Sequence, residues 1–200
     1  GGAEVAEHCV KRLKTLDMFP ETESGMLGMV QILAAETSDM EAGSTLSMVS
    51  VTPEGAIVAV LGDSPVIITA EDGTVCVSPE HNVRTNHAER EAAVSRGGRY
   101  SGGYIWRGDS GLQMSRALGD AHLSGILSRV PEVYTVPNPR WVLVLSDGVL
   151  DPAHAETSEL IGDDLQQLME TITEPKAQDV LDWAKARGLA DNATVVLWRW

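Results

Sequence analysis

The sequence predicts an α+β fold in which a strand-rich core is flanked by helices. Helical periodicity occurs near the two ends of the chain, whereas the middle holds apolar runs of strand length that are separated by turn residues. The two kinds of segment come in blocks and not in strict alternation, which disfavours βαβ units. Because 200 residues suffice for one domain with its own core, we expect a single domain over residues 1–200.

Two amphipathic helices are expected first. Over residues 3–17 the apolar residues recur at helical spacing, and Phe19-Pro20 ends the segment. Thr22 is the expected cap of a second helix. The residues expected on the inner side of this second helix are Met26, Leu27, Val30, Leu33 and Ala34.

Two hairpins are expected next. The stretch GSTLSMVSVT alternates polar and apolar residues, and Pro53-Glu54-Gly55 forms a turn before the apolar run AIVAVLGDS. The stretch PVIITAEDGTVCVS has the same character, with its turn at Glu71-Asp72-Gly73. Both stretches are therefore predicted to be antiparallel strand pairs.

Residues 80–120 differ from the rest, because they are polar and rich in Gly and Arg. We expect an irregular, flap-like insertion that contains one short helix, HAEREAAVSR, ended by Gly97-Gly98. Regular structure is expected to return as strands at 133–136 and 141–145. Helices at 157–172 and 175–187 and a final strand, ATVVLWRW, complete the expected elements.

The acidic composition narrows the classes of partner. A formal net charge of −14 argues against nucleic acid, since phosphate backbones select Lys and Arg patches, and against an anionic membrane surface. No stretch is long and apolar enough to span a membrane. Cys9 and Cys76 are expected to be reduced thiols, which favours a cytoplasmic location.

Acidic residues stand at the ends of three apolar strands. Asp63 follows AIVAVLG, the run WVLVLSDGVLD provides Asp147 and Asp151, and Asp191 precedes the last strand. Each of them alone is an ordinary turn residue or helix cap. Four carboxylates at one edge of a sheet would repel one another unless they shared divalent cations, and oxygen ligands favour Mg²⁺ or Mn²⁺. Two such ions can activate water against a phosphate ester.

Taken in order, five stretches resemble the metal-dependent serine/threonine protein phosphatases of type 2C. They are GSTLSMVSVTPEGAIVAVLGDS, HAEREAAVSRGGRY, GLQMSRALGD, WVLVLSDGVLD and DNATVVLW. The resemblance runs from Gly1 to Trp200. It implies a four-layer αββα sandwich of two antiparallel sheets between helices. It also implies hydrolysis of phosphoserine and phosphothreonine in a phosphoprotein substrate by a metal-activated water.

The resemblance also assigns roles to individual residues. Asp147 and Asp191 match ligands of two core Mn²⁺ or Mg²⁺ ions, and Asp63 and Asp151 resemble ligands of a weaker third ion. Three residues of the SRALGD motif match positions that support the site and the flap, and one of them, the arginine, is expected to pair with an acid. These supporting residues are Ser115, Arg116 and Asp120.

The chain departs from the family pattern at its start. Gly1-Gly2-Ala3 resembles the tail of the family's Asp-Gly-His-Gly-Gly motif, so the metal-bridging Asp and the general-acid His would lie upstream of Gly1. The strand with the phosphate-binding Arg would lie there too, and no catalytic residue is identifiable in the chain itself. We therefore expect an N-terminally truncated sandwich with an exposed sheet edge. The chain alone would have low or no activity, and if it truly lacks these strands it would borrow a strand from a partner or self-associate. Alternatively, the chain is a portion of a protein that has these strands, which the missing initiator Met favours.

Two other interpretations remain open at this point. The chain could be a catalytically inactive phosphatase-fold module that binds a protein partner, which an absent upstream Asp-Gly-His would favour. Alternatively, the acids could be turn residues of an unrelated α+β domain, although the ordered set of motifs argues against this.

Overall fold

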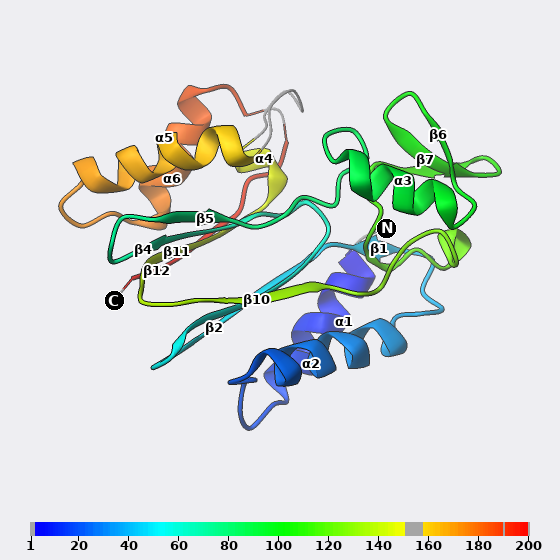
Figure 1. The fold of residues 1–200 in the computed structure, drawn as a ribbon, viewed down its shortest axis with the longest axis horizontal. Coiled ribbons are helices and arrows are strands. Elements are labelled where there is room, and N and C mark those ends of the chain that lie inside the picture. Colours follow the sequence, from blue (N-terminus) through cyan, green and yellow to red (C-terminus); the bar gives the residue numbers. More distant parts are fainter. Residues whose placement is uncertain (1–2, 151–157, 190, 200) are drawn as a thin grey trace.

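Two antiparallel sheets form the centre of the protein in a computed structural model that describes residues 3–150, 158–189 and 191–199 (Figure 1). The first sheet has the strand order β10-β3-β2 and the second has the order β12-β11-β4-β5. The strands of the first sheet are β2 (Leu46–Thr52), β3 (Gly55–Leu61) and β10 (Glu132–Val136). Those of the second are β4 (Val66–Ala70), β5 (Val75–Val77), β11 (Pro139–Leu145) and β12 (Val195–Arg199).

Helices cover the outer faces of both sheets. α1 (Ala3–Lys14) and α2 (Glu23–Glu36) pack on the first sheet. α5 (Ser158–Thr171) and α6 (Ala177–Ala186) pack on the second, together with the short α4 (Asp147–Leu150). This confirms the predicted α+β class and the four-layer αββα sandwich. In the described part of the chain, no helix combines the length and apolar character that crossing a bilayer requires.

Strand β3 is buried along its whole length because its two faces serve two different cores. Ala56, Val58 and Val60 point between the two sheets, where they pack with residues of the second sheet. Ile57 and Ala59 point the other way, into the core beneath α1 and α2. This explains why AIVAVL reads as an unbroken apolar run and not as an alternating one.

The predicted N-terminal helices form, with small differences at their ends. The Oγ1 of Thr22 accepts a hydrogen bond from the backbone N–H of Gly25 at 3.0 Å, so Thr22 caps α2 as expected. Helix α1 ends at Lys14, three residues early. The N–H groups of Thr15 and Leu16 bond to carbonyls three residues back, which tightens and ends the last turn.

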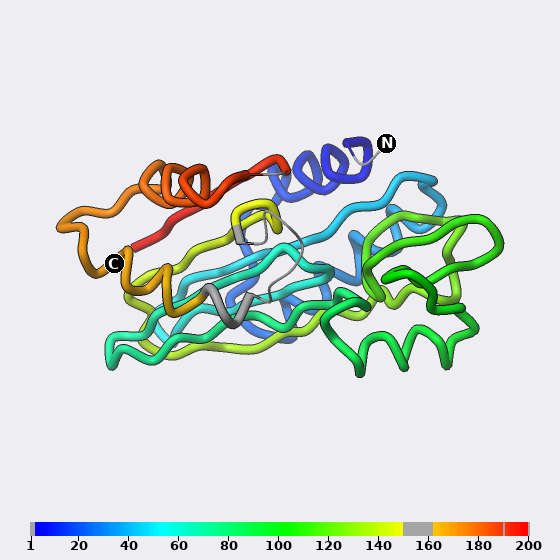
Figure 2. The backbone as a smooth tube through the Cα atoms, turned by 90° about the horizontal axis from the view of Figure 1, so that it is seen from above, coloured from blue at the N-terminus to red at the C-terminus, as the bar shows by residue number. Residues whose placement is uncertain are grey.

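The flap-like segment is more regular than the sequence predicts. After α3 (His87–Ser95), three short strands form an antiparallel sheet, β6-β7-β8, that packs on its own apolar cluster and projects at one end of the molecule (Figure 2). These strands are β6 (Arg99–Ser101), β7 (Tyr104–Arg107) and β8 (Ser110–Leu112). Gly102, Gly103 and Gly108 adopt positive φ angles in the turns, which residues with side chains rarely do. The expectation of an irregular segment is wrong for these residues.

The remaining short elements join the flap to the first sheet. β1 (Gly43–Ser44) pairs with β9 (Leu118–Gly119), and the 3₁₀ turn η1 (Ala121–Leu123) follows directly. The base of the flap is therefore hydrogen-bonded to the segment that leads into β2.

Candidate metal centre

Acidic residues from separate strands meet at one end of the sandwich. β11 ends at Leu145, which pairs with Val195, the first residue of β12. Asp147 therefore leaves the second sheet where the segment with Asp191 enters it. Asp63 follows β3 and lies close enough to Asp147 for the charge of Asp147 to raise its pKa.

Ser146 holds the segment before β12 against the end of β11. Its backbone N–H donates to the carbonyl of Thr194 at 3.1 Å, and its Oγ accepts from the N–H of Thr194 at 2.9 Å. The same hydroxyl donates to the carbonyl of Asn192 at 3.1 Å. One serine thus fixes the loop that carries Asp191 next to the residue that precedes Asp147.

Gly148 is required by the same close approach. A Cβ at this position would lie 2.6 Å from the carbonyl oxygen of Asn192, too close for any side chain. Asp191 itself is exposed, and its Oδ1 accepts a hydrogen bond from the N–H of Asn192 at 2.6 Å. The backbone of Asp147-Gly148 is therefore in contact with the backbone of Asp191-Asn192.

The half-buried Asp63 has a pKa that is shifted well above its ordinary value. Burial, together with the charges of Asp147 and Glu80, raises its pKa to about 6. A hydrogen bond from Asn82 Nδ2, at 2.9 Å, partly offsets this rise. No cationic side chain is among the causes of the shift. The carboxylates thus repel one another, which is the situation that a divalent cation relieves.

The structure brings three of the four predicted metal ligands together. Asp63 and Asp147 lie within electrostatic range of each other, and Asp191 is placed beside Asp147 by the backbone contacts. Asp151 lies outside the described residues. Glu80 was missed by the sequence analysis, although it shows the same signal as the others, an acid soon after a strand, here β5.

His81 connects this acidic group to the base of the flap. It is fully buried; its backbone N–H donates to the carbonyl of Gly62 at 3.1 Å, and its Nδ1 accepts from the N–H of Gly62 at 2.9 Å. Burial, together with the charge of Arg116, lowers the pKa of His81 to about 4. The ring is therefore neutral at pH 7 and holds the residue directly before Asp63.

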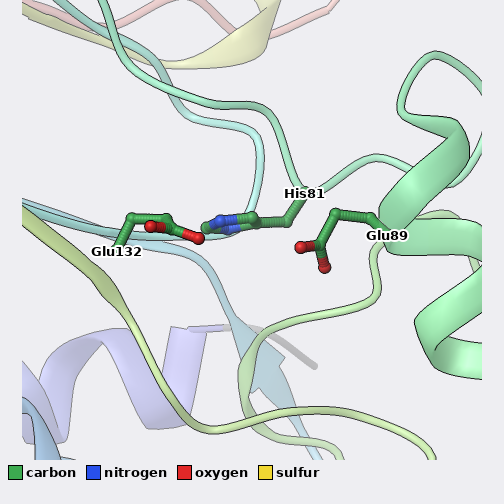
Figure 3. Close-up of side chains that lie close together, drawn as sticks. All are labelled: His81, Glu89 and Glu132. Atoms are coloured by element: carbon green, nitrogen blue, oxygen red, sulfur yellow. The ribbon is translucent and has the colours of Figure 1, made fainter.

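Two of the supporting residues, Ser115 and Arg116, form a network of ion pairs and hydrogen bonds with the acids beside His81. Figure 3 shows His81 with the two acids of this network, Glu89 and Glu132. Arg116 pairs through Nη2 with Glu89 at 2.5 Å and with Glu132 at 2.9 Å. The hydroxyl of Ser115 donates to Glu89. Burial would raise the pKa of Glu89, but the bonds from Arg116 and Ser115 outweigh it and lower the pKa.

This network also has the composition of a metal site, since His81, Glu89 and Glu132 offer ligand atoms within 4.8 Å of one another. However, Arg116 already occupies oxygens of both carboxylates. A cation would have to displace the arginine, so the group near Asp63 is the better candidate.

Asp120, the last residue of the motif, lies at the β1–β9 junction. It adopts a left-handed conformation with φ of 48°, and its N–H donates to the carbonyl of Ala42 at 2.9 Å. A Cβ on Gly43 would overlap the Asp120 carboxylate, which explains the glycine. Asp120 therefore lies against the segment that leads into β2, at the junction of β1 and β9.

Comparison with known proteins gives consistent matches. A family model described as "Protein phosphatase 2C" matches residues 15–193. A rice (Oryza sativa subsp. japonica) protein named "Probable protein phosphatase 2C 59" is 28% identical over 213 residues, which cover 100% of this chain and 63% of the relative. "Probable protein phosphatase 2C 69" of Arabidopsis thaliana is 28% identical, with 100% and 58% covered. The chain thus spans about three fifths of the length of these relatives.

Solved structures agree with the fold. A structure titled "Structure of a C.elegans sex determining protein" has a TM-score of 0.69 at 22% identity, covering 96% of this chain and 50% of that one. A serine-threonine phosphatase 2C from Toxoplasma gondii has a TM-score of 0.66 at 19% identity, with 94% and 72% covered. These two likenesses concern the fold.

Replacing Asp63 with asparagine should stabilise the metal-free protein at about pH 7.5 by about 1–3 kcal/mol. The folded-state pKa of Asp63 is raised to about 6 from an ordinary value of 3.8. The parent therefore loses stability as pH rises through this window, whereas the Asn variant does not. Urea unfolding in EDTA near pH 4 and near pH 7.5 measures this. Asp191→Asn, at an exposed position, is the control, and an equal gain at both pH values would contradict the prediction.

Replacing Arg116 with methionine should destabilise the protein by about 3 kcal/mol, because it leaves the buried Glu89 without its cation. The double variant Arg116→Met/Glu89→Leu should recover part of this loss, since no lone charge remains. Thermal or urea unfolding of the two single variants and the double variant gives the coupling. The exposed Arg140→Met is the matched control. Additive losses in the double variant would show that the pair is not coupled.

Proposed function

Because this chain belongs to the protein phosphatase 2C family, we propose that it carries the metal-binding part of a protein serine/threonine phosphatase. The observation that carries the proposal is the meeting of Asp63, Asp147 and the Asp191 loop at one end of the sandwich. The proposed reaction is hydrolysis of phosphoserine and phosphothreonine in phosphoproteins. The family is metal-dependent, and the acidic residues at this end are the proposed ligands.

We assign Asp147 and Asp191 to two core ions, and Asp63 and Asp151 to a weaker third. Carboxylate oxygens are the ligands that Mn²⁺ and Mg²⁺ prefer, so the donor set fits these ions. The raised pKa of Asp63 supports the fit, because it arises from burial and from acidic neighbours. A divalent ion would compensate this repulsion and favour the ionised carboxylates.

Bound divalent ions would supply a water of lowered pKa and polarise the phosphoryl group. The residues of this chain hold the carboxylates in position. Ser146 fixes the segment behind Asp191, and His81 fixes Gly62 in front of Asp63. The family resemblance puts the general acid and the phosphate-binding arginine in an Asp-Gly-His segment and the strand before it, so we propose that such a segment completes the site.

An open edge of the sandwich supports a place for that segment. Among the described residues, β2 pairs only with β3, and β12 pairs only with β11. A hollow of about 500 Å³ lies between these two edges and is lined mainly by apolar side chains. They include Met48 and Val49 of β2, Val144 of β11, and Val196 and Trp198 of β12.

We propose that extended, strand-forming polypeptide occupies this hollow and continues both sheets. Unpaired edge strands present N–H and C=O groups to such a segment, and the apolar lining would receive its alternate side chains. Val196 is 57% exposed, so part of the inter-sheet core faces solvent at this edge. A strand-donating partner would fill it in the complete assembly, and the isolated chain would pair with a second copy.

The proposed location is the cytoplasm. Cys9 and Cys76 are both free thiols, and Cys9 is buried. Unpaired cysteines are typical of a reducing compartment. The substrate in this setting would be a phosphorylated protein.

Asp147→Asn should weaken Mn²⁺ binding at least about tenfold, because one core carboxylate is lost. Isothermal titration with Mn²⁺ measures binding, and phosphate release from a phosphothreonine peptide measures activity. The control is Asp17→Asn, an exposed acid elsewhere. Equal Mn²⁺ affinity in the two variants would contradict the assignment of Asp147.

The same experiment separates the enzyme from an inactive relative. Mn²⁺-dependent phosphate release that Asp147→Asn abolishes supports the proposed reaction. Mn²⁺ binding without any release, from a chain that remains folded, would instead favour a phosphatase-fold module that binds a protein partner.

Val196→Lys should reduce self-association of the isolated chain, because it places a charge in the open apolar edge. Sedimentation velocity over a range of concentrations measures association, and the fluorescence of an apolar dye such as ANS reports exposed apolar surface. Val94→Lys is the matched control, since Val94 is 45% exposed on α3. A parent chain that stays monomeric and binds no dye would overturn the open-edge proposal.

A further inference from the structure

Positive charge is concentrated in one quarter of this acidic chain. Residues 81–130 contain seven arginines and four acidic residues, a formal net charge of +3. The other 150 residues contain eight basic and 25 acidic residues, a net charge of −17. We call residues 81–130 the cationic segment. It includes α3 and the β6-β7-β8 sheet, which form one end of the molecule (Figure 2).

The arginines of the cationic segment differ in the partners of their guanidinium groups. Arg116 is paired with Glu89 and Glu132, but Arg96 and Arg129 use their guanidinium groups on backbone carbonyls. A carbonyl satisfies the hydrogen bond and leaves the charge in place. The cationic segment is therefore a region of positive potential beside an acidic body.

The β6-β7-β8 sheet has an outer face with a distinct composition. Arg99 pairs across the strands with Trp106, and Ser101 pairs with Tyr104, so these four side chains share one face. Ile105, between them in sequence, points to the buried cluster on the other face. We call the surface formed by Arg99, Ser101, Tyr104 and Trp106 the flap face.

The flap face is hollowed and partly aromatic. Its hollow has a volume of about 420 Å³ and is lined by Arg99, Tyr104 and Trp106, with Asp109 also in its wall. The rings of Tyr104 and Trp106 have centroids 5.7 Å apart at 47°. Arg99 is exposed, and Tyr104 is 38% exposed. The face therefore offers an accessible guanidinium beside two ring faces.

Two further arginines lie close to the β6-β7-β8 sheet. Arg90 lies over the ring of Tyr100 at 4.7 Å, on the opposite face of the sheet, since Tyr100 pairs with Ile105. Arg84 lies against the β6–β7 turn, because a Cβ on Gly103 would be 3.0 Å from its side-chain carbons. Arg99 is therefore the arginine on the flap face itself, and Arg84 adjoins the turn at its edge.

A short path leads from this face to the acidic site. The N–H of Arg84 donates to the side chain of Asn82 at 3.0 Å, and Asn82 in turn donates to Asp63 at 2.9 Å. The β6–β7 turn, which adjoins Arg84, is therefore connected to Asp63 of the candidate metal centre through Arg84 and Asn82. A peptide that reaches the metal centre would have the flap face within its length.

We propose that the flap face binds an acidic segment of the phosphoprotein substrate, at a distance from the phosphorylated residue. This inference rests on the proposed phosphatase function and specifies its substrate class. Guanidinium groups bind carboxylates through charge-assisted hydrogen bonds, and exposed rings add contact area for the peptide. The rest of the protein is acidic and repels an acidic peptide. The peptide would therefore bind at the cationic segment.

The charge pattern also distinguishes among anionic partners. A long nucleic acid would extend beyond the cationic segment and meet the acidic body, which carries −17. A short acidic peptide segment fits within the flap face. Single-stranded RNA is therefore the alternative that the experiment must exclude.

The test uses binding of unphosphorylated peptides, so that it is independent of hydrolysis. A fluorescein-labelled peptide rich in Asp and Glu is compared with the same peptide carrying Asn and Gln, by anisotropy with the full chain. The acidic peptide should bind more tightly, with an affinity that falls as salt is raised. Equal binding of the two peptides would overturn the proposal, as would tighter binding of a labelled single-stranded RNA of similar length.

Single substitutions with opposite expected signs sharpen the test. Arg99→Gln should weaken binding of the acidic peptide about threefold to fivefold, and Asp109→Asn should strengthen it by about twofold. Arg140→Gln should have no effect. Arg140 is a matched control, because it is an exposed arginine that lies over a ring, Trp141 at 4.8 Å, outside the cationic segment. Equal losses from Arg99→Gln and Arg140→Gln would overturn the assignment to the flap face.

A kinetic comparison links the surface to the reaction. With phosphothreonine peptides that carry an acidic segment, Arg99→Gln should raise KM about threefold to fivefold and leave kcat unchanged. A loss of kcat with unchanged KM would overturn the binding role. If no peptide is hydrolysed but the acidic peptide still binds through Arg99, the proposed function fails while the flap face stands.

Discussion

The burial of Asp63 beside other carboxylates, at the common end of the two sheets, is the constraint on which the proposed chemistry of this protein depends. Asp63 follows β3, a strand that is buried on both faces, and Asp147 follows β11, which pairs with strands on both sides. Neither side chain can move far from the other without disturbing a central strand. The fold therefore keeps like charges close at a cost in stability that a divalent ion would offset.

A neutral histidine and an ionised Glu–Arg pair connect the flap to this acidic end. His81 is neutral and holds Gly62, and its own carbonyl accepts from the backbone N–H of Ser115 at 2.8 Å. The Glu89–Arg116 pair beside it is ionised and largely buried. Because these bonds are short and shielded from water, the base of the flap and the loop before Asp63 are positioned together.

Two exposed surfaces of opposite character flank this arrangement. The hollow between β2 and β12 is apolar and lies at unpaired strand edges, which suits a strand-forming segment. The flap face is basic and aromatic, which suits an acidic peptide. In the functions proposed for them, the first would complete the site and the second would hold the substrate near it.

The sequence by itself determined which segments are helices and which are strands for most elements. It also determined which strands end in the acidic residues expected to bind metal. The cap at Thr22, the alternation in β2 and the acids after β3 and β11 are local signals, and local backbone preferences express them directly. Tertiary structure alone decided which distant groups meet. Glu80 joins Asp63 from another hairpin, and Glu89 meets Arg116 from 27 residues away, because loop paths determine such contacts and no local period encodes them. The three-residue strands of the flap are too short for a period to be recognised, so only pairing defined them.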